Sequence, residues 1–205
     1  NLPLAICKKY KLCSRFEALK WIHFPENNAQ LNAARRRLKW EELFVSQLKI
    51  ARVKAFNEAS KGYTFEKVGD LFNTFYKSYI PFELTNAQKR VLKEIRKDLG
   101  SNAQMNRLLQ GDVGSGKTIV ALLTILIALD NGFQAAFMAP TEILAAQHYN
   151  SVGELLQGMD VTVKLLTGST NTKERKIIHE QLLTGELNIL IGTHALIEDK
   201  VKFKN

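Results

Sequence analysis

The fold of this chain is decided by one stretch, Gly111-Asp112-Val113-Gly114-Ser115-Gly116-Lys117-Thr118. It matches in full the pattern G-x-x-x-x-G-K-[ST], a loop that leads from a strand into a helix and cradles phosphates. Glycines let the backbone come close to an anion, and successive N–H groups then point at it as a nest. The positive end of the following helix adds to the attraction. The stretch therefore predicts a nucleoside triphosphate site.

Two side chains of this loop carry chemistry. Lys117 is expected to reach the β- and γ-phosphates, and Thr118 to offer its hydroxyl to Mg²⁺. We therefore predict ATP and Mg²⁺ as cofactors, Lys117 and Thr118 as the catalytic residues, and Thr118 as the metal ligand. The alternative is an incidental glycine-rich turn, but the pattern arises by chance in roughly one chain of this length per hundred.

The sequence around the loop alternates between helical and strand patterns. Thr85 is placed to cap a helix that runs to Leu99, and the loop should lead into a helix that ends near Gly132. The other expected helices cover residues 141–157 and 172–183, and the expected strands cover residues 107–110, 134–138, 161–166 and 188–191. Strands separated by helices predict a parallel sheet with helices on both faces. The fold class is therefore α/β.

The first 80 residues read differently. Residues 2–24 predict one or two short helices, and apolar residues at helical spacing predict one long helix over residues 28–59. Its basic cluster, Arg35 to Arg37 with Lys39, suits phosphates, a solvated face or packing against another domain. Residues 61–81 are rich in aromatic side chains, which would stack on bases or, as we favour, pack a junction. We place a domain boundary near Ile80, between residues 1–80 and 81–205.

Charge is distributed unevenly along the chain. The first 100 residues contain 20 Lys and Arg against 10 Asp and Glu, whereas the remaining residues contain 9 against 10. A basic half joined to a neutral nucleotide-binding half suggests a polyanionic partner, most simply nucleic acid. Lysines that only keep the chain in solution are the alternative.

Three further features bound the class of protein. The longest apolar stretch, residues 119–129, is too short to cross a membrane, so no membrane association is expected. Cys7 and Cys13 match no metal-ligand spacing and indicate free thiols of a cytoplasmic protein. The start resembles no signal peptide, and because Asn1 rather than Met stands first, we expect a segment of a longer protein.

Several segments, in order, resemble the motifs of superfamily-two DNA helicases of the RecG family. The residues from Phe82 to Gln88 resemble the adenine-reading Q motif, and residues 107–121 resemble motif I. Residues 138–148 are similar to motif Ia, residues 166–169 to motif Ib, and residues 192–196 to the nucleic-acid motif that follows. Upstream, residues 18–25 and 33–44 resemble the segment that joins the wedge domain of that family to its motor. The resemblance covers almost the whole chain.

This resemblance implies a partial first RecA-like domain, preceded by a helical linker region with one long helix. It implies an ATP-dependent helicase that acts on forks and Holliday junctions in recombination and repair, with branched DNA as partner and a monomeric motor in the parent protein. The expected ATP-binding residues are Phe82, Thr85, Gln88, Gly111, Asp112, Val113, Gly114, Ser115, Gly116, Lys117 and Thr118. The expected DNA-contacting residues are Thr141, Thr167, Gly168, Ser169, Thr193 and His194, which would hold phosphates without reading sequence.

The family's Asp-Glu-x-His box, which positions the attacking water, does not occur in these 205 residues. Phosphoryl transfer needs such a group, so this chain alone is expected to hydrolyse no ATP. Three alternatives stay open. A transcription-repair coupling translocase shares a similar loop, although Ser115 and the Ala-Arg-Arg-Arg-Leu segment, residues 34–38, argue against it. The others are a P-loop phosphotransferase without nucleic acid and a DNA-binding module with a vestigial loop.

Overall fold

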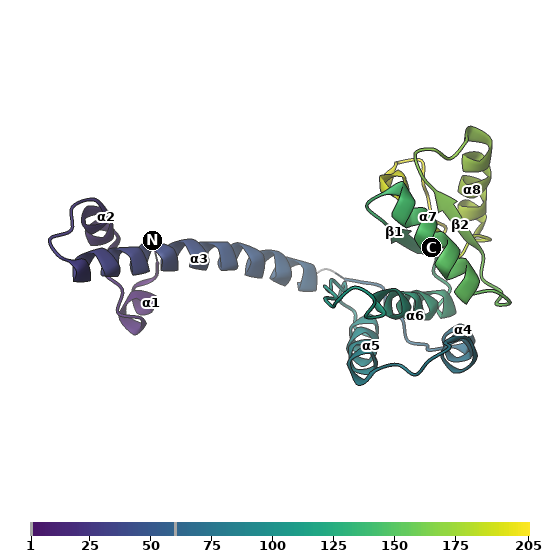
Figure 1. Ribbon diagram of the computed structural model, residues 1–205, viewed down its shortest axis with the longest axis horizontal. Helices are drawn as coiled ribbons and strands as arrows, with labels where there is room; N and C mark the ends of the chain where they lie inside the picture. Colours follow the sequence, from purple (N-terminus) through teal and green to yellow (C-terminus); the bar gives the residue numbers. More distant parts are fainter. Residues whose placement is uncertain (1, 60) are drawn as a thin grey trace. The chain divides into compact units, whose positions relative to one another are not determined.

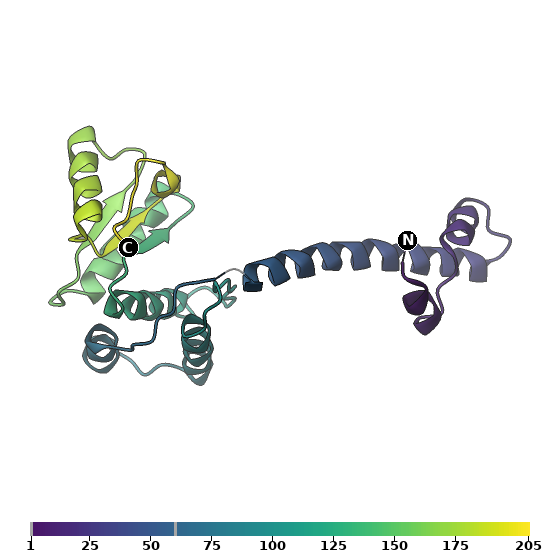
Figure 2. The same ribbon diagram turned by 180° about the vertical axis from the view of Figure 1, so that it is seen from behind.

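The computed structural model describes residues 2–59 and 61–205, and its backbone is shown from two sides in Figures 1 and 2. Contacts divide the chain into two compact units, Asn1–Ser60 and Lys61–Asn205. Each unit is described by itself. The boundary between a linker region and a motor domain that we predict near Ile80 is a functional division, and it stays a prediction.

The first unit is helical. It contains α1 (Leu4–Lys9), α2 (Arg15–His23) and the long helix α3 (Asn28–Ala59), as the sequence predicts. Helix α2 begins with a capping box, in which the hydroxyl of Ser14 accepts from the N–H of Glu17 while the Glu17 carboxylate accepts from the N–H of Ser14. The hydrogen bonds to Ser14 lower the pKa of Glu17.

Arg37 is the only charged side chain buried in the described part of the first unit. Its Nη1 lies 2.9 Å from Oε2 of Glu41, and its Nε donates to the carbonyl of Cys13 over 3.0 Å. Arg36, which is exposed, donates to the carbonyl of Tyr10. Part of the basic cluster therefore ties the segment before α2 to α3, a use that we did not predict.

The second unit begins with a short helical segment and continues as an α/β fold. Its first helices are α4 (Asp70–Thr74), the π-helix η1 (Phe75–Tyr79), α5 (Asn86–Leu99) and α6 (Lys117–Asp130). They are followed by β1 (Ala135–Met138), α7 (Glu142–Leu155), β2 (Val163–Leu166), α8 (Thr172–Thr184), β3 (Ile189–Gly192) and the 3-10 helix η2 (His194–Ile197). Helices and strands alternate as predicted.

The three strands form a parallel sheet in the order β1-β3-β2. The predicted parallel sheet is confirmed, but the strand predicted over residues 107–110 is wrong. A strand is defined by backbone hydrogen bonds to a neighbour, and the sheet of the described residues pairs its three strands only with one another. Leu108 is accordingly 88% exposed. The phosphate-binding loop is therefore preceded by a segment that pairs with none of the described strands.

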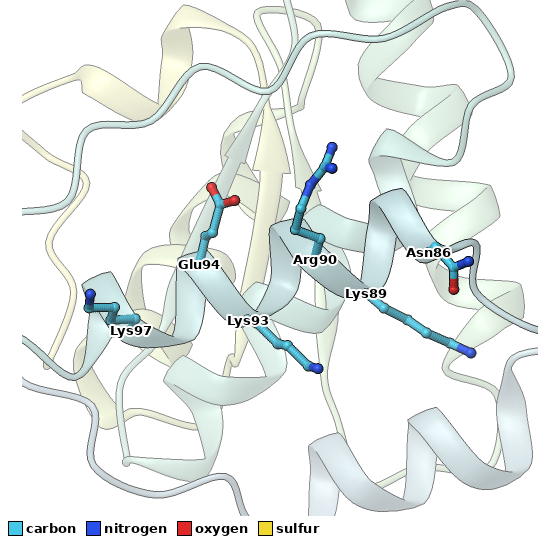
Figure 3. Close-up of a pocket in the computed structure, with 6 residues that line it drawn as sticks. All are labelled: Asn86, Lys89, Arg90, Lys93, Glu94 and Lys97. Atoms are coloured by element: carbon cyan, nitrogen blue, oxygen red, sulfur yellow. The ribbon is translucent and has the colours of Figure 1, made fainter.

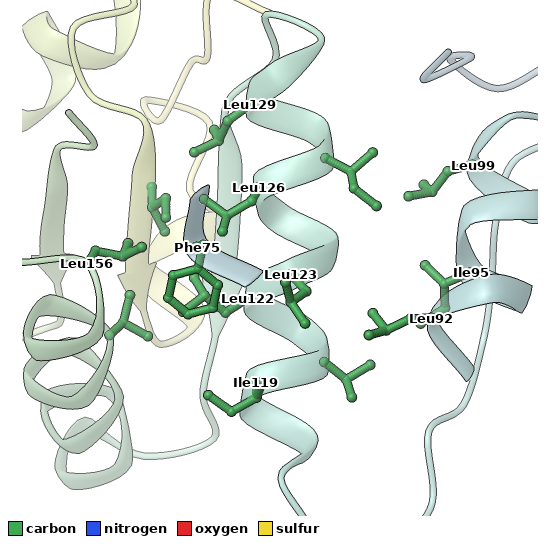
Figure 4. Packing of buried hydrophobic residues seen from close by; sticks show 14 of the residues in the cluster. Phe75, Leu92, Ile95, Leu99, Ile119, Leu122, Leu123, Leu126, Leu129 and Leu156 are labelled. Carbon is green, nitrogen blue, oxygen red and sulfur yellow. The ribbon is translucent and has the colours of Figure 1, made fainter. Parts of the chain in front are cut away.

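Both faces of the sheet are covered. On the central strand β3, Ile189 and Ile191 join the main core around α6, whereas Leu190 between them joins a second core with α8. Such burial on both faces is typical of a parallel sheet between two helical layers. Figure 4 shows α6 between the apolar face of α5 on one side and Phe75 with Leu156 on the other.

The aromatic segment before α5 packs onto this core. Phe75 is fully buried, and Phe65, Phe72 and Tyr79 lie against the same cluster, which confirms the packing interpretation for these residues. Asp130, at the end of α6, holds the segment in place: its carboxylate accepts from the N–H groups of Gly69, Leu71 and Phe72 at 2.9 to 3.1 Å. Those are the unpaired donors of the first turn of α4.

Candidate nucleotide and nucleic-acid site

The phosphate-binding loop has the backbone that its glycines predict. Gly114 and Gly116 adopt φ angles of 80° and 79°, in the left-handed region that side chains with a Cβ avoid. Helix α6 begins directly after Gly116, so its free N–H groups and positive end face the loop. Val113 is fully exposed at the loop's outer side. This arrangement provides an anion nest joined to a helix N-terminus.

Lys117 folds back over this loop. Its ammonium donates to the carbonyls of Gly111 and Asp112 at 2.8 and 2.7 Å. These carbonyls begin the loop, so the positive charge lies beside the loop that is expected to hold a phosphate. Thr118 follows in the first turn of α6 and is half-buried.

The donor set suits Mg²⁺ that is held chiefly by a nucleotide. Mg²⁺ is commonly bound by one or two protein oxygens together with phosphates and water. The hydroxyl of Thr118 would be one such oxygen, and the described residues contain no cluster of three or more His, Cys, Asp or Glu that would hold a metal by itself.

The Q-like segment is in direct contact with the loop. Thr85 and Gln88 form a capping box, in which the Thr85 N–H donates to Oε1 of Gln88 over 2.8 Å. The other end of the same amide, Nε2, donates to the carbonyl of Ser115 over 2.9 Å. Phe82 lies nearby in sequence and is 50% exposed. The contact between Gln88 and Ser115 links two predicted groups of site residues, and sequence reasoning missed it.

A second group of predicted residues lies at the carboxyl end of the sheet. The last residues of the strands are in register, with Met138 and Leu166 on either side of Gly192. The three turns that follow therefore begin at the same edge. They carry the residues predicted to contact DNA, namely Thr141, Thr167, Gly168, Ser169, Thr193 and His194.

These residues differ in how much of their polar surface is free. The Thr141 hydroxyl caps α7 by accepting from the Leu144 N–H, as the capping alternative predicts. Thr167 is buried, and its hydroxyl lies 2.9 Å from that of Ser169. Thr193 is half-buried and His194 is exposed. Exposed backbone and hydroxyl groups at such turns are suited to phosphate oxygens.

Glu142 ties two of these turns together. Its carboxylate accepts from the Ser169 N–H at 3.2 Å and from the Ser169 hydroxyl at 2.9 Å. Arg175 supports the same turn from α8, because it donates to the Thr167 carbonyl and pairs with Glu198 at 3.0 Å. Sequence reasoning missed both positioning residues. Glu142 follows the capping residue Thr141, and nothing in the sequence around it indicates a contact with Ser169, 27 residues away.

Comparisons with known proteins agree on one family. Residues 85–205 match the family model described as DEAD/DEAH box helicase. The chain is 50% identical over 204 residues to the "ATP-dependent DNA helicase RecG" of Bacillus subtilis, covering 99% of this chain and 30% of that protein. It is 48% identical over 205 residues to the RecG of Thermotoga maritima, covering 100% of this chain and 26% of that protein.

A solved structure extends this likeness to three dimensions. The chain is similar to the "Structure of RecG bound to three-way DNA junction", with a TM-score of 0.88 and 47% sequence identity. The match covers 100% of this chain and 28% of that one. The chain thus spans less than a third of the length of these relatives. Within the described residues, no helix is both long and apolar enough to cross a membrane.

Proposed function

This chain belongs to the DEAD/DEAH box helicase family, and from that premise we propose that it is a segment of an ATP-dependent DNA helicase that acts on branched DNA. The observation that carries the proposal is the similarity to RecG helicases, which extends over 99% or more of the chain at 48 to 50% identity. A relative of known structure is bound to a three-way DNA junction, which supports forks and Holliday junctions as substrates in recombination and repair.

In this proposal the loop from Gly111 to Thr118 binds the triphosphate of ATP. Lys117 lies against the first two carbonyls of the loop and would exchange them for β- and γ-phosphate oxygens. Thr118 would ligate Mg²⁺, which when bound neutralises charge on the phosphates. The positive φ angles of Gly114 and Gly116 support this role, because a loop that points successive N–H groups at an anion needs such conformations.

Adenine would lie against the Q-like segment, with Phe82 beside the base and Gln88 reading it. A primary amide has two N–H donors and two acceptor sites, and Gln88 uses one of each on Ser115 and Thr85. One donor and one acceptor are left, which is the pair that the amino group and ring nitrogen of adenine require. Thr85 then acts as a positioning residue that orients the amide.

DNA would cross the carboxyl end of the sheet. Thr141, Gly168 and His194 are exposed along this edge, and Thr193 is half-buried beside them. Thr167 is buried, and Ser169 would exchange its two bonds to Glu142 for phosphate oxygens. Contacts of this kind hold the phosphate backbone and leave the base sequence unread. That is the recognition expected of a motor that must move along any sequence.

We further propose that residues 81–205 belong to the first motor domain and residues 1–80 to a linker, within a monomeric cytoplasmic protein. These 205 residues contain no Asp-Glu-x-His sequence. The chain by itself should therefore bind ATP without hydrolysing it, because a group that positions the attacking water is needed for turnover.

Binding of a fluorescent ATP analogue to the 205-residue chain tests the nucleotide site. Lys117→Ala should weaken binding at least about tenfold, since it removes a charged contact to the phosphates. Lys176→Ala, which removes an exposed lysine of α8, is the matched control and should leave binding unchanged. Equal affinity of both variants and the unaltered chain would refute the phosphate role of the loop.

A further inference from the structure

Helix α5 carries a strongly basic surface outside the proposed ATP and DNA sites. Its two carboxylates share a single cationic partner, because Arg107 lies 2.7 Å from Glu94 and 2.6 Å from Asp98. These bonds, led by that to Asp98, raise the pKa of Arg107. Five cations of α5 are in no ion pair in the described parts of the chain: Lys89, Arg90, Lys93, Arg96 and Lys97.

Part of this surface borders a groove between α5 and the α4–η1 segment. The groove has a volume of about 250 Å³, and we call it the α5 groove. It is lined by Val68, Phe72, Tyr76, Lys89, Leu92, Lys93, Arg96 and Ile127. Figure 3 shows that Lys89 and Lys93 extend from the same side of α5, while Arg90 and Glu94 point away from them. The groove thus has an apolar floor and a cationic rim.

The π-helix η1 sets a flat aromatic surface in this groove. The Ile80 N–H donates to the Phe75 carbonyl, five residues back, and Phe75 itself is fully buried in the core. The next residue, Tyr76, is 39% exposed, and its ring stacks on Phe72 with centroids 6.0 Å apart and planes 8° from parallel. Turns of π-helix occur frequently at functional sites. Packing of the core therefore accounts for Phe75 but leaves the exposed ring of Tyr76 unexplained.

We propose that the α5 groove binds single-stranded DNA, with one base stacked on Tyr76 and the backbone phosphates held by Lys89, Lys93 and Arg96. Aromatic rings beside a row of cations are the combination that binds single strands without sequence preference. A duplex keeps its bases stacked inside, so it has no free base face for Tyr76. The proposal rests on the proposed function, since an unwinding motor produces single strands.

The cationic rim is tested by the salt dependence of binding. A fluorescent oligothymidylate is titrated with the 205-residue chain, without nucleotide, over a series of salt concentrations. The triple variant Lys89→Gln, Lys93→Gln, Arg96→Gln should reduce the slope of log K against log salt by about 2, that is about 0.7 for each lost phosphate contact. The matched control Lys176→Gln, Lys200→Gln, Lys202→Gln removes three exposed lysines elsewhere in the same unit and should leave the slope unchanged.

The aromatic contact is tested separately. Tyr76→Leu should weaken binding about fivefold or more with an unchanged salt slope, because a stacked base is lost but no phosphate contact. Tyr76→Phe keeps the ring and should bind as the unaltered chain does. Circular dichroism of each variant establishes that the fold is retained.

Three results would overturn the proposal. In the first, the triple variant has the same salt slope as its control. In the second, Tyr76→Leu binds the oligothymidylate with unaltered affinity. In the third, Tyr76→Leu loses as much affinity for blunt duplex DNA as for the single strand. None of these depends on ATP. A negative result for DNA binding in the α5 groove would therefore say nothing against the nucleotide site. A negative result for nucleotide binding would likewise leave the DNA titration interpretable.

Discussion

The side-chain amide of Gln88 donates a hydrogen bond to the carbonyl of Ser115, 2.9 Å away, and so joins helix α5 to the phosphate-binding loop. The other end of the amide is fixed by the N–H of Thr85. One side chain therefore spans the segment expected to read the base and the loop expected to hold the phosphates. A base that binds Gln88 would meet an amide whose orientation is already set.

Gln88→Ala should reduce the preference for ATP over GTP. The variant loses two hydrogen bonds to adenine, each worth about 0.5 to 1.5 kcal/mol, so affinity for ATP should fall about tenfold while that for GTP changes little. Competition of ATP and GTP against a fluorescent ATP analogue measures both. Gln104→Ala, at an exposed glutamine before the loop, is the control. An unchanged preference would remove Gln88 from base recognition.

Asp130→Ala should destabilise the second unit by about 2 to 3 kcal/mol. The substitution leaves three N–H groups at the start of α4 without their charged acceptor. Urea unfolding of the 205-residue chain measures the change, with Asp160→Ala, an exposed aspartate, as the control. If both substitutions cost the same, the capping of α4 contributes nothing specific.

Glu142→Ala should weaken DNA binding severalfold, because Ser169 loses both of its bonds to the carboxylate and the turn after β2 is held only by its remaining contacts, such as that of Arg175. Glu142→Gln keeps an acceptor oxygen for the Ser169 N–H and should bind nearly normally. Fluorescence anisotropy with a labelled fork measures the affinities, and Glu154→Ala on the same helix is the control. Tighter binding by both Glu142 variants would instead show that the carboxylate repels DNA.

The capping box of α2 should weaken in acid. The pKa of Glu17 is lower in the folded chain than in the unfolded one, because the ionised carboxylate accepts from Ser14. Its contribution is therefore fully present above the unfolded pKa and is lost as pH falls through the folded pKa. NMR titration of the Glu17 carboxyl group and hydrogen exchange in α2 follow this change. Once exchange rates are corrected for the intrinsic effect of pH, Glu17→Gln, which does not ionise, should remove the part of the change in protection of α2 that follows the Glu17 titration.

Features set by local sequence were predictable. The starts of α5 at Thr85 and of α7 at Thr141 follow from capping side chains, and the end of α8 at Gly185 follows from a glycine in the left-handed conformation. The phosphate-binding loop was likewise predictable from consecutive residues.

Features set by distant partners were not predictable. Residues 107–110 have a strand-like sequence but pair with none of the described strands. The contacts of Gln88 with Ser115 and of Glu142 with Ser169 each join residues 27 positions apart. Periodicity and capping patterns describe neighbours along the chain, so they contain no information on such pairs. The π-helix that exposes Tyr76 also depends on how Phe75 packs in the core.

The most direct test of the central claim is ATP hydrolysis by the full-length helicase that contains this chain, measured with forked DNA, with linear duplex and without DNA, beside Lys117→Ala. We predict strong stimulation by the fork, weaker stimulation by linear duplex, and loss of at least about 99% of the activity in the variant, because transition-state charge on the phosphates loses its cation. Hydrolysis that is indifferent to DNA, or that survives Lys117→Ala, would contradict a branched-DNA motor driven through this loop.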